Sequence, residues 1–330
     1  MSTTKDTQAP KKALLSSAAR QKLLAFASLI GLMVFFSFAS PAFMQTENMV
    51  GILQATAVNG VLAIACTFVI ITSGIDLSVG TVMTFCSVMM GVLLTYWGLP
   101  LWAGVLGAIF FGALCGAVSG MMIAKMKLPP FIATLGMMLV TKGLALVISG
   151  TKPIYFDVEG LSAISLDSLI GEVFPALPIP NGVLIMFLVA LAGTFILNKT
   201  ILGTYTFALG SNEEAVRLSG VNTARWKIII YTFAGAICGI AGLLMASRLN
   251  SAQPALGQGY EMDAIAAVVI GGTSLSGGSG TILGTIIGAF MISVLTNGLR
   301  IMSVAQEWQI ILTGLIIILA VFADNMRKKK

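Results

Sequence analysis

The chain is a succession of long apolar runs separated by short polar segments. These runs lie near residues 23–39, 50–72, 79–96, 101–124, 130–149, 181–197, 228–247, 262–272, 281–298 and 308–323. Most of them approach the ~20 residues that an α-helix needs to cross a bilayer. The run near 262–272 is too short, so a broken or re-entrant helix is expected there. The pattern predicts an all-α integral membrane protein with about ten transmembrane helices.

The composition supports this class and weakens two others. The chain is 57% hydrophobic and 10% charged, whereas soluble domains are about a quarter charged. It has no histidine, and its four cysteines lie in apolar stretches without a C-x-x-C pair, so no metal site, disulfide framework or cofactor is expected. An integral membrane enzyme is disfavoured, because the spans contain neither histidine nor paired carboxylates.

Basic residues gather in alternate segments between the apolar runs. With the amino terminus inside, the inner segments carry Lys5, Lys11, Lys12, Arg20, Lys22, Lys125, Lys127, Lys199, Arg217, Arg225, Lys227, Arg327, Lys328, Lys329 and Lys330. The outer segments carry only Lys152, Arg248 and Arg300, while Lys142 falls within a span. The positive-inside rule therefore predicts that both termini are cytoplasmic.

The expected organisation follows from these two patterns. A cytoplasmic tail covers residues 1–22, a transmembrane domain covers 23–324, and a basic cytoplasmic tail covers 325–330. An external loop is expected at 151–180 and a cytoplasmic loop at 198–227.

The cytoplasmic loop contains a short predicted helix. In "ALGSNEEAVRLSGVNTARWK" (208–227), Ser211 and Glu214 have capping-box spacing, Glu213 adds a second acidic residue in the first turn, and Gly220 suits the left-handed position after a helix end. A helix over 212–219 is too short to be stable alone. It packs either on its own membrane domain or on a partner.

Several motifs carry a family resemblance. "EAVRLSG" (214–220) resembles the E-A-A-x-x-x-G loop of ABC importer permeases, with Val216 replacing the second alanine. That loop is the coupling helix that fits into a cleft on a cytoplasmic ATPase. The further motifs are "TSGIDLSVG" (72–80), "FIATLGMM" (131–138), "LGSNEEAVRLSG" (209–220), "SAQPALGQGYEMDAIAAVVIGGTSLSGGSGT" (251–281) and "NGL" (297–299). Together they resemble the monosaccharide permease family, closest to its ribose-type member, over nearly the whole chain.

The resemblance implies a membrane-spanning permease subunit of an ATP-driven importer for ribose or a similar monosaccharide. It implies a homodimer in the bacterial inner membrane, two cytoplasmic ATPase subunits, and a periplasmic sugar-binding protein. The acidic external loop at 151–180 is either a docking site for that protein or an ordinary solvated loop. Membrane lipid surrounds the spans, and no cofactor or nucleic-acid partner is expected. Coupling to the ATPase is assigned by the same resemblance to Glu213, Glu214, Ala215, Arg217, Leu218 and Gly220.

The sequence contains no Walker A motif for ATP binding. ATP binding through a Walker A loop requires a Gly-Lys dipeptide, which does not occur in the sequence. The glycine-rich "GGTSLSGGSGT" (271–281) is therefore not such a loop, and ATP hydrolysis is expected in a separate subunit. A self-contained proton-coupled transporter is the alternative, but it normally needs several buried titratable groups, and Asp76 alone gives it little support.

Two polar breaks interrupt the apolar runs. Asp76 either lines the translocation path, as expected of an intramembrane carboxylate, or it caps the third span together with Ser78. The 271–281 segment is either an unwound cavity lining or a tight turn. Asn59, Gln253 and Gln258 are uncharged groups able to bind sugar hydroxyls. The candidate path residues are Asn59, Asp76, Ser78, Thr273 and Ser274.

Three basic residues on the outer side oppose the charge bias. Lys152, Arg248 and Arg300 are candidates for pairing with acidic groups on the binding protein.

Overall fold

The computed structural model describes residues 17–175 and 177–328, and the parts of the predicted tails at 1–16 and 329–330 lie outside it. The described chain is almost entirely helical. Its helices are α1 (Ser17–Ala39), α2 (Thr46–Ile71), α3 (Val79–Gly91) with a π-helical end (Val92–Tyr96), α4 (Leu101–Ala124), α5 (Pro130–Ser149), a 3-10 turn (Ser162–Ile164), α6 (Leu169–Val173), α7 (Asn181–Lys199), α8 (Ile201–Leu218), α9 (Thr223–Leu249), α10 (Tyr260–Ile270), α11 (Ile282–Ile301) and α12 (Gln306–Lys328). Two short strands, β1 (Ile154–Tyr155) and β2 (Ser251–Ala252), pair antiparallel.

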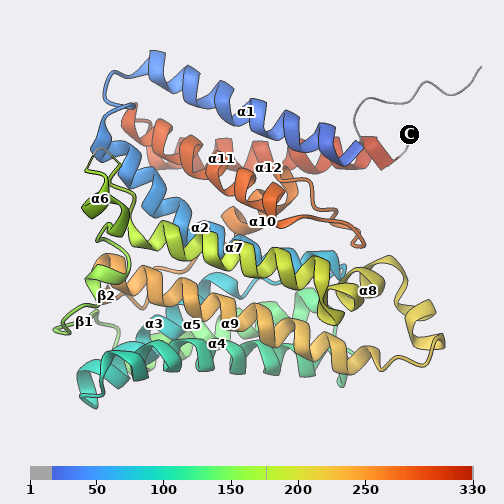
Figure 1. Cartoon of the computed structure of the whole chain (residues 1–330). Coiled ribbons are helices and arrows are strands. Elements are labelled where there is room, and N and C mark those ends of the chain that lie inside the picture. Colours follow the sequence, from blue (N-terminus) through green and yellow to red (C-terminus); the bar gives the residue numbers. More distant parts are fainter. Residues whose placement is uncertain (1–16, 176, 329–330) are drawn as a thin grey trace, which may run out of the picture.

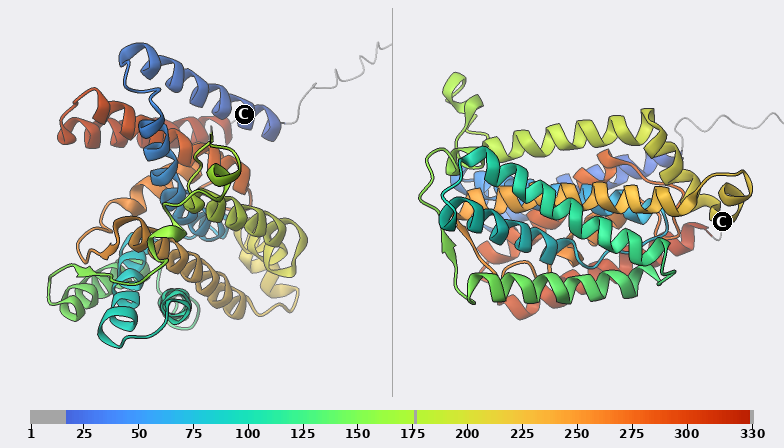
Figure 2. Two further views of the ribbon diagram at one scale, coloured as in Figure 1. Left: turned by 60° about the vertical axis from the view of Figure 1, so that its left-hand side comes forward. Right: turned by 90° about the horizontal axis from the view of Figure 1, so that it is seen from below.

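The long helices run along a common direction and form three groups (Figures 1 and 2). Helices α1, α11 and α12 lie on one side, α3, α4, α5 and α9 lie on the other, and α2 passes between them. The central helix α2 is buried along most of its length and contacts α7, α9, α10 and α11. The main hydrophobic core therefore surrounds α2.

The two ends of the bundle differ. The β1–β2 pair and α6 lie at one end, while the bent tip of α8 and both ends of the described chain lie at the other (Figure 1). This arrangement has the two termini on the same side as the predicted cytoplasmic helix. At the opposite end, the described residues of the predicted external loop (151–180) form β1, the 3-10 turn and the five-residue α6, and β1 pairs with β2 from the segment after α9.

Glycines allow α4 and α9 to pack at very short distance. A Cβ added to Gly112 or Gly116 of α4 would run into the backbone of α9 at Gly235 or Tyr231. A Cβ at Gly239 would likewise run into Ala108. Small residues of this kind favour helix association in membranes, where lipid supplies no hydrophobic drive between helices.

Seven described helices are long and apolar enough to cross a membrane: α2, α3 with its π-helical end, α4, α5, α7, α9 and α11. Leu23–Ala39 forms a shorter apolar helix, and the run at 308–323 lies within α12. The run at 262–272 forms α10, which has 11 residues. The prediction that this segment is too short to span the membrane is therefore confirmed.

Candidate functional site

The segment that was predicted as a cytoplasmic loop is mostly helix. Helix α8 begins at Ile201 and bends at Asn212, where φ is −163° and ψ is 95°. The part before the bend buries Gly203, Thr206 and Leu209 against the bundle. This part was missed because "ILGTYTFALG" contains two glycines and three threonine or β-branched residues in ten, which lowers its helix propensity.

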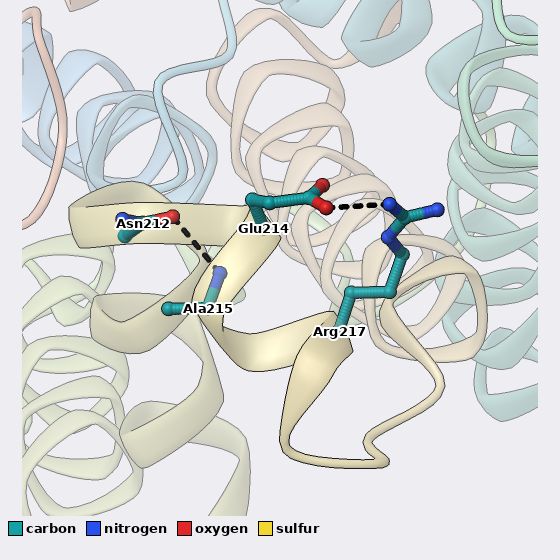
Figure 3. Close-up of polar contacts among 4 residues, drawn as sticks. All are labelled: Asn212, Glu214, Ala215 and Arg217. Carbon is teal, nitrogen blue, oxygen red and sulfur yellow. Dashed lines mark hydrogen bonds and ion pairs between the residues drawn. The ribbon is translucent and has the colours of Figure 1, made fainter.

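Residues 212–220, which are the end of α8 after the bend and the turn that follows it, are named the coupling segment after their predicted role. Its predicted cap was wrong by one residue: the Asn212 Oδ1, and not a Ser211 hydroxyl, accepts a hydrogen bond from the Ala215 N–H at 2.9 Å (Figure 3). Asn212 takes this role because its backbone is extended, as an N-cap requires. The left-handed conformation predicted at Gly220 is confirmed, with φ of +83°.

The charged residues of the coupling segment are paired. Arg217 Nη2 lies 2.5 Å from Glu214 Oε1 (Figure 3), and this hydrogen bond raises the pKa of Arg217. Lys227 Nζ, in the first turns of α9, lies 2.6 Å from Glu213 Oε1. Val216 packs against the core while Leu218 is 78% exposed. The segment is thus anchored on one side and open to solvent on the other.

The base of the coupling segment contacts both polar breaks. Ser73, after α2, donates hydrogen bonds from its hydroxyl to the carbonyl oxygens of Ser276 (2.8 Å) and Gly210 (3.3 Å). The Gly278 N–H donates to the Ile71 carbonyl at 2.9 Å. Three elements therefore meet here: the end of α2, the 271–281 loop and the bend of α8.

Asp76 is buried, and its carboxylate is hydrogen-bonded to Ser78, the residue that precedes α3. Its Oδ1 accepts hydrogen bonds from the Ser78 N–H at 2.8 Å and from the Ser78 hydroxyl at 2.6 Å. The Thr134 hydroxyl of α5 donates to the Ile75 carbonyl at 3.1 Å, which fixes the same break to a neighbouring helix. Asp76 thus accepts from the residue that precedes α3, while the Ser78 side chain makes no capping hydrogen bond to the helix, so the choice between cap and path lining stays open.

The remaining path candidates are buried at separate places. Asn59 lies in α2, and Thr273 and Ser274 lie in the 271–281 loop. Within the described residues, Asn59 Oδ1 and Thr273 Oγ1 have no hydrogen-bond partner, whereas the Ser274 hydroxyl accepts from the Ser276 N–H at 3.3 Å. The structure therefore does not bring the five candidates into one cluster.

A second junction was not predicted. The first turns of α3 and α10 face each other inside the bundle, so closely that a Cβ on Gly80 would run into the Gly257 carbonyl. The buried carboxylate of Glu261 accepts hydrogen bonds from the Gly259 N–H at 3.0 and 3.1 Å. The sequence signal for this junction was "GQGYE", in which glycines precede an acidic first turn.

The three outer cations are not equivalent. Arg248 and Arg300, near the ends of α9 and α11, interact electrostatically with each other and with Tyr260. Lys152 is exposed in the loop after α5. In the part of the chain that the structure describes, none of the three forms an ion pair.

The chain matches a family of transport permeases and several sugar import permeases in sequence. Residues 48–321 match the family described as branched-chain amino acid transport system / permease component. The chain is 42% identical over 306 residues to the ribose import permease protein RbsC of Escherichia coli (strain K12), which covers 91% of this chain and 94% of that protein. It is 40% identical over 327 residues to RbsC of Bacillus subtilis (strain 168), covering 99% of both chains. It is 39% identical to the fructose import permease protein FrcC of Rhizobium meliloti, covering 91% of this chain and 84% of that one. No solved structure matches the chain.

Proposed function

The chain belongs to the branched-chain amino acid transport system / permease component family, and from this membership we infer that it is the multi-pass inner-membrane permease subunit of a bacterial ABC sugar importer. The observation that carries this conclusion is the 40–42% identity to ribose import permeases over at least 91% of the chain. Relatives named for fructose and xylose import fall in the same set, so the cargo class is a monosaccharide. We propose ribose or a sugar of similar size as the cargo.

The coupling segment is the proposed contact with the ATPase. Glu213, Glu214, Ala215, Arg217, Leu218 and Gly220 form this contact in our proposal, because the segment is exposed, capped at Asn212 and fixed to α9 through Lys227. Its base is hydrogen-bonded to the end of α2 and to the 271–281 loop through Ser73. A displacement of the segment would therefore be transmitted to both breaks, in the manner of a two-state element biased by a partner.

The source of energy is assigned to another chain. The sequence contains no Gly-Lys dipeptide and so no Walker A loop, and ABC importers of this kind require ATPase and periplasmic binding-protein partners. We propose that ATP is hydrolysed in separate cytoplasmic subunits and that two copies of the permease form the pore in the lipid bilayer. Lys152, Arg248 and Arg300 are the proposed docking residues for the binding protein, because none is engaged in an ion pair among the described residues.

Purified complexes in lipid vesicles test this function. Sugar enclosed with its binding protein on one side should cross only when ATP reaches the ATPase on the other. A pH gradient without ATP should drive no uptake. Uptake by the permease alone under a pH gradient would favour the proton-coupled transporter instead.

A further inference from the structure

One charged residue lies within a membrane-spanning helix and is not explained by the coupling or docking roles. Lys142 sits in the interior of α5 (Pro130–Ser149) and is half-buried. Its Nζ donates a hydrogen bond at 2.8 Å to Oε1 of Gln258. Gln258 belongs to the coil that leads from β2 to α10, so the contact joins α5 to the broken helix.

A lysine at this depth does not face lipid at low cost. An ammonium group near the centre of a spanning helix costs at least about 2.5–3.5 kcal/mol when it faces hydrocarbon. α5 packs mainly on α3 and α4, and its lipid-facing side carries apolar residues instead, with Val140 55% and Val147 79% exposed. Lys142 lies about 160° around the helix from Val140 and about 60° from Ala145, which is buried against the bundle. Lys142 therefore points away from the exposed apolar face and toward Gln258.

The Lys142–Gln258 contact lies beside a narrow cavity. The two side chains line a cavity of about 10 Å³ together with Thr81, Thr84, Pro254, Ala255 and Gly257. The cavity lies at the junction where the first turns of α3 and α10 face each other. This volume is room for roughly one water molecule, so the cavity does not hold a sugar while Lys142 and Gln258 are in contact.

We propose that Lys142 and Gln258 form a sugar-contacting constriction of the translocation path. The inference rests on the proposed function, in which a monosaccharide crosses between two copies of the chain. The ammonium offers three hydrogen-bond donors, and the amide offers both donors and an acceptor, which matches a ring of hydroxyl groups that donate and accept.

The contact also accounts for passage without tight binding. A hydroxyl that enters the constriction replaces the Lys142–Gln258 hydrogen bond with hydrogen bonds of its own. Because one protein hydrogen bond is exchanged for others, the net gain is small, and the sugar is released after the constriction.

Cysteine accessibility tests the position of these side chains. The native cysteines Cys66, Cys86, Cys115 and Cys238 are all buried, so their reaction with a charged, membrane-impermeant thiol reagent should be slow. In the assembled complex in vesicles, thiols introduced by Lys142→Cys and Gln258→Cys should react at least tenfold faster than one introduced by Val140→Cys. Val140 is the matched control, because it lies two residues away and about 160° around the same helix.

The reaction should be measured without nucleotide, with ATP and with a trapped hydrolysis intermediate. Added sugar should slow labelling in the turning-over complex. The proposal is overturned if thiols at 142 and 258 react no faster than the one at 140 in all three states.

Transport by charge variants gives a second measurement. Lys142→Met should lower sugar uptake roughly tenfold or more, as expected for loss of a hydrogen bond to a charged group, while Lys142→Arg keeps most of it. Thermal stability of the purified complex should be similar in the two variants. If Met supports wild-type uptake, Lys142 does not contact the sugar. These outcomes are separate from the proposed function, which fails only if the wild-type complex itself imports no sugar with ATP.

Discussion

Lys227 Nζ lies 2.6 Å from Glu213 Oε1, and this ion pair ties the coupling segment to the first turns of α9. The rings of Tyr205 and Trp226 stack near the same place, with their centroids 4.4 Å apart. α9 in turn packs along α4 through the glycine contacts and along α2. The ion pair therefore joins the coupling segment to a helix that packs on both α4 and the central α2.

Neutralising this ion pair should weaken coupling more than stability. Glu213→Gln or Lys227→Gln should reduce the stimulation of ATP hydrolysis by the sugar-loaded binding protein. Unfolding free energy should change by only about 0.2–1 kcal/mol, because the pair is partly exposed. ATPase assays on the reconstituted complex and thermal melts measure the two effects.

The charge-swapped double variant, Glu213→Lys with Lys227→Glu, should recover part of the stimulation. Lys199→Gln is the matched control, because Lys199 is exposed at the same end of the bundle and forms no ion pair among the described residues. A response that stays at the wild-type level in both single variants would contradict the role given to the pair.

Binding of the ATPase should require Gly220 because of its left-handed backbone conformation, and not because of the space around it. Its φ is +83°, and a Cβ at this position would have nothing within 4 Å, so steric contact is not an issue. Gly220→Val should disfavour the left-handed conformation by about 1–2 kcal/mol and weaken co-purification of the ATPase. Gly220→Asn should be milder, because asparagine tolerates this region better. Equal ATPase binding by the two variants would show that the turn does not matter.

The sequence predicted the all-α membrane class, and seven of its ten apolar runs form helices long enough to cross a membrane, because hydrophobic length follows from bilayer thickness. The count of about ten spans stays a prediction. The sequence also predicted that the run at 262–272 is too short to span, which α10 confirms, and the left-handed turn at Gly220. These features depend on local composition. A run of apolar residues, or a glycine after a charged helical turn, is enough to predict the local structure without knowledge of distant contacts.

The rest depends on contacts between distant segments, which one sequence does not encode locally. The capping residue was misplaced by one position because Ser211 and Asn212 are both good caps, and the bend of α8 decides between them. The contact of Lys142 with Gln258 joins residues 116 positions apart. The path candidates Asp76 and Thr273 were chosen for polarity, but polarity does not say which side chain faces a cavity.

Charge reversal on the outer side should impair docking of the binding protein in a salt-dependent way. Arg248→Glu and Arg300→Glu should lower binding-protein stimulation of ATP hydrolysis at low salt. The difference from wild type should shrink above ~0.15 M salt, where screening acts over about 8 Å. Arg248 is half-buried, so Arg248→Gln serves as its control for folding. A stimulation curve that does not depend on salt would rule out electrostatic docking here.

The last prediction concerns the point where α8 meets the polar breaks. A Cβ on Gly210 would run into the carbonyl oxygen of Ile71 and would lie close to the Gly278 N–H, which bonds to that same carbonyl. Because both obstacles are backbone atoms, they cannot rotate away. Gly210→Ala should therefore push α8 off the 271–281 loop at a cost of at least about 1–3 kcal/mol. The purified complex should melt at a lower temperature.

Two further variants separate packing from coupling at this point. Gly143→Ala in α5 has nothing within 4 Å of the added methyl and should be neutral or slightly stabilising, because alanine favours helix over glycine. Ser73→Ala removes the hydrogen bonds to Gly210 and Ser276 without a clash, so it should cost about 1 kcal/mol. If the contact transmits motion, Ser73→Ala should also lower sugar uptake per ATP hydrolysed, since the loop would follow α8 less closely. Normal uptake per ATP in Ser73→Ala, together with a normal melting temperature in Gly210→Ala, would mean that α8 and the 271–281 loop move independently.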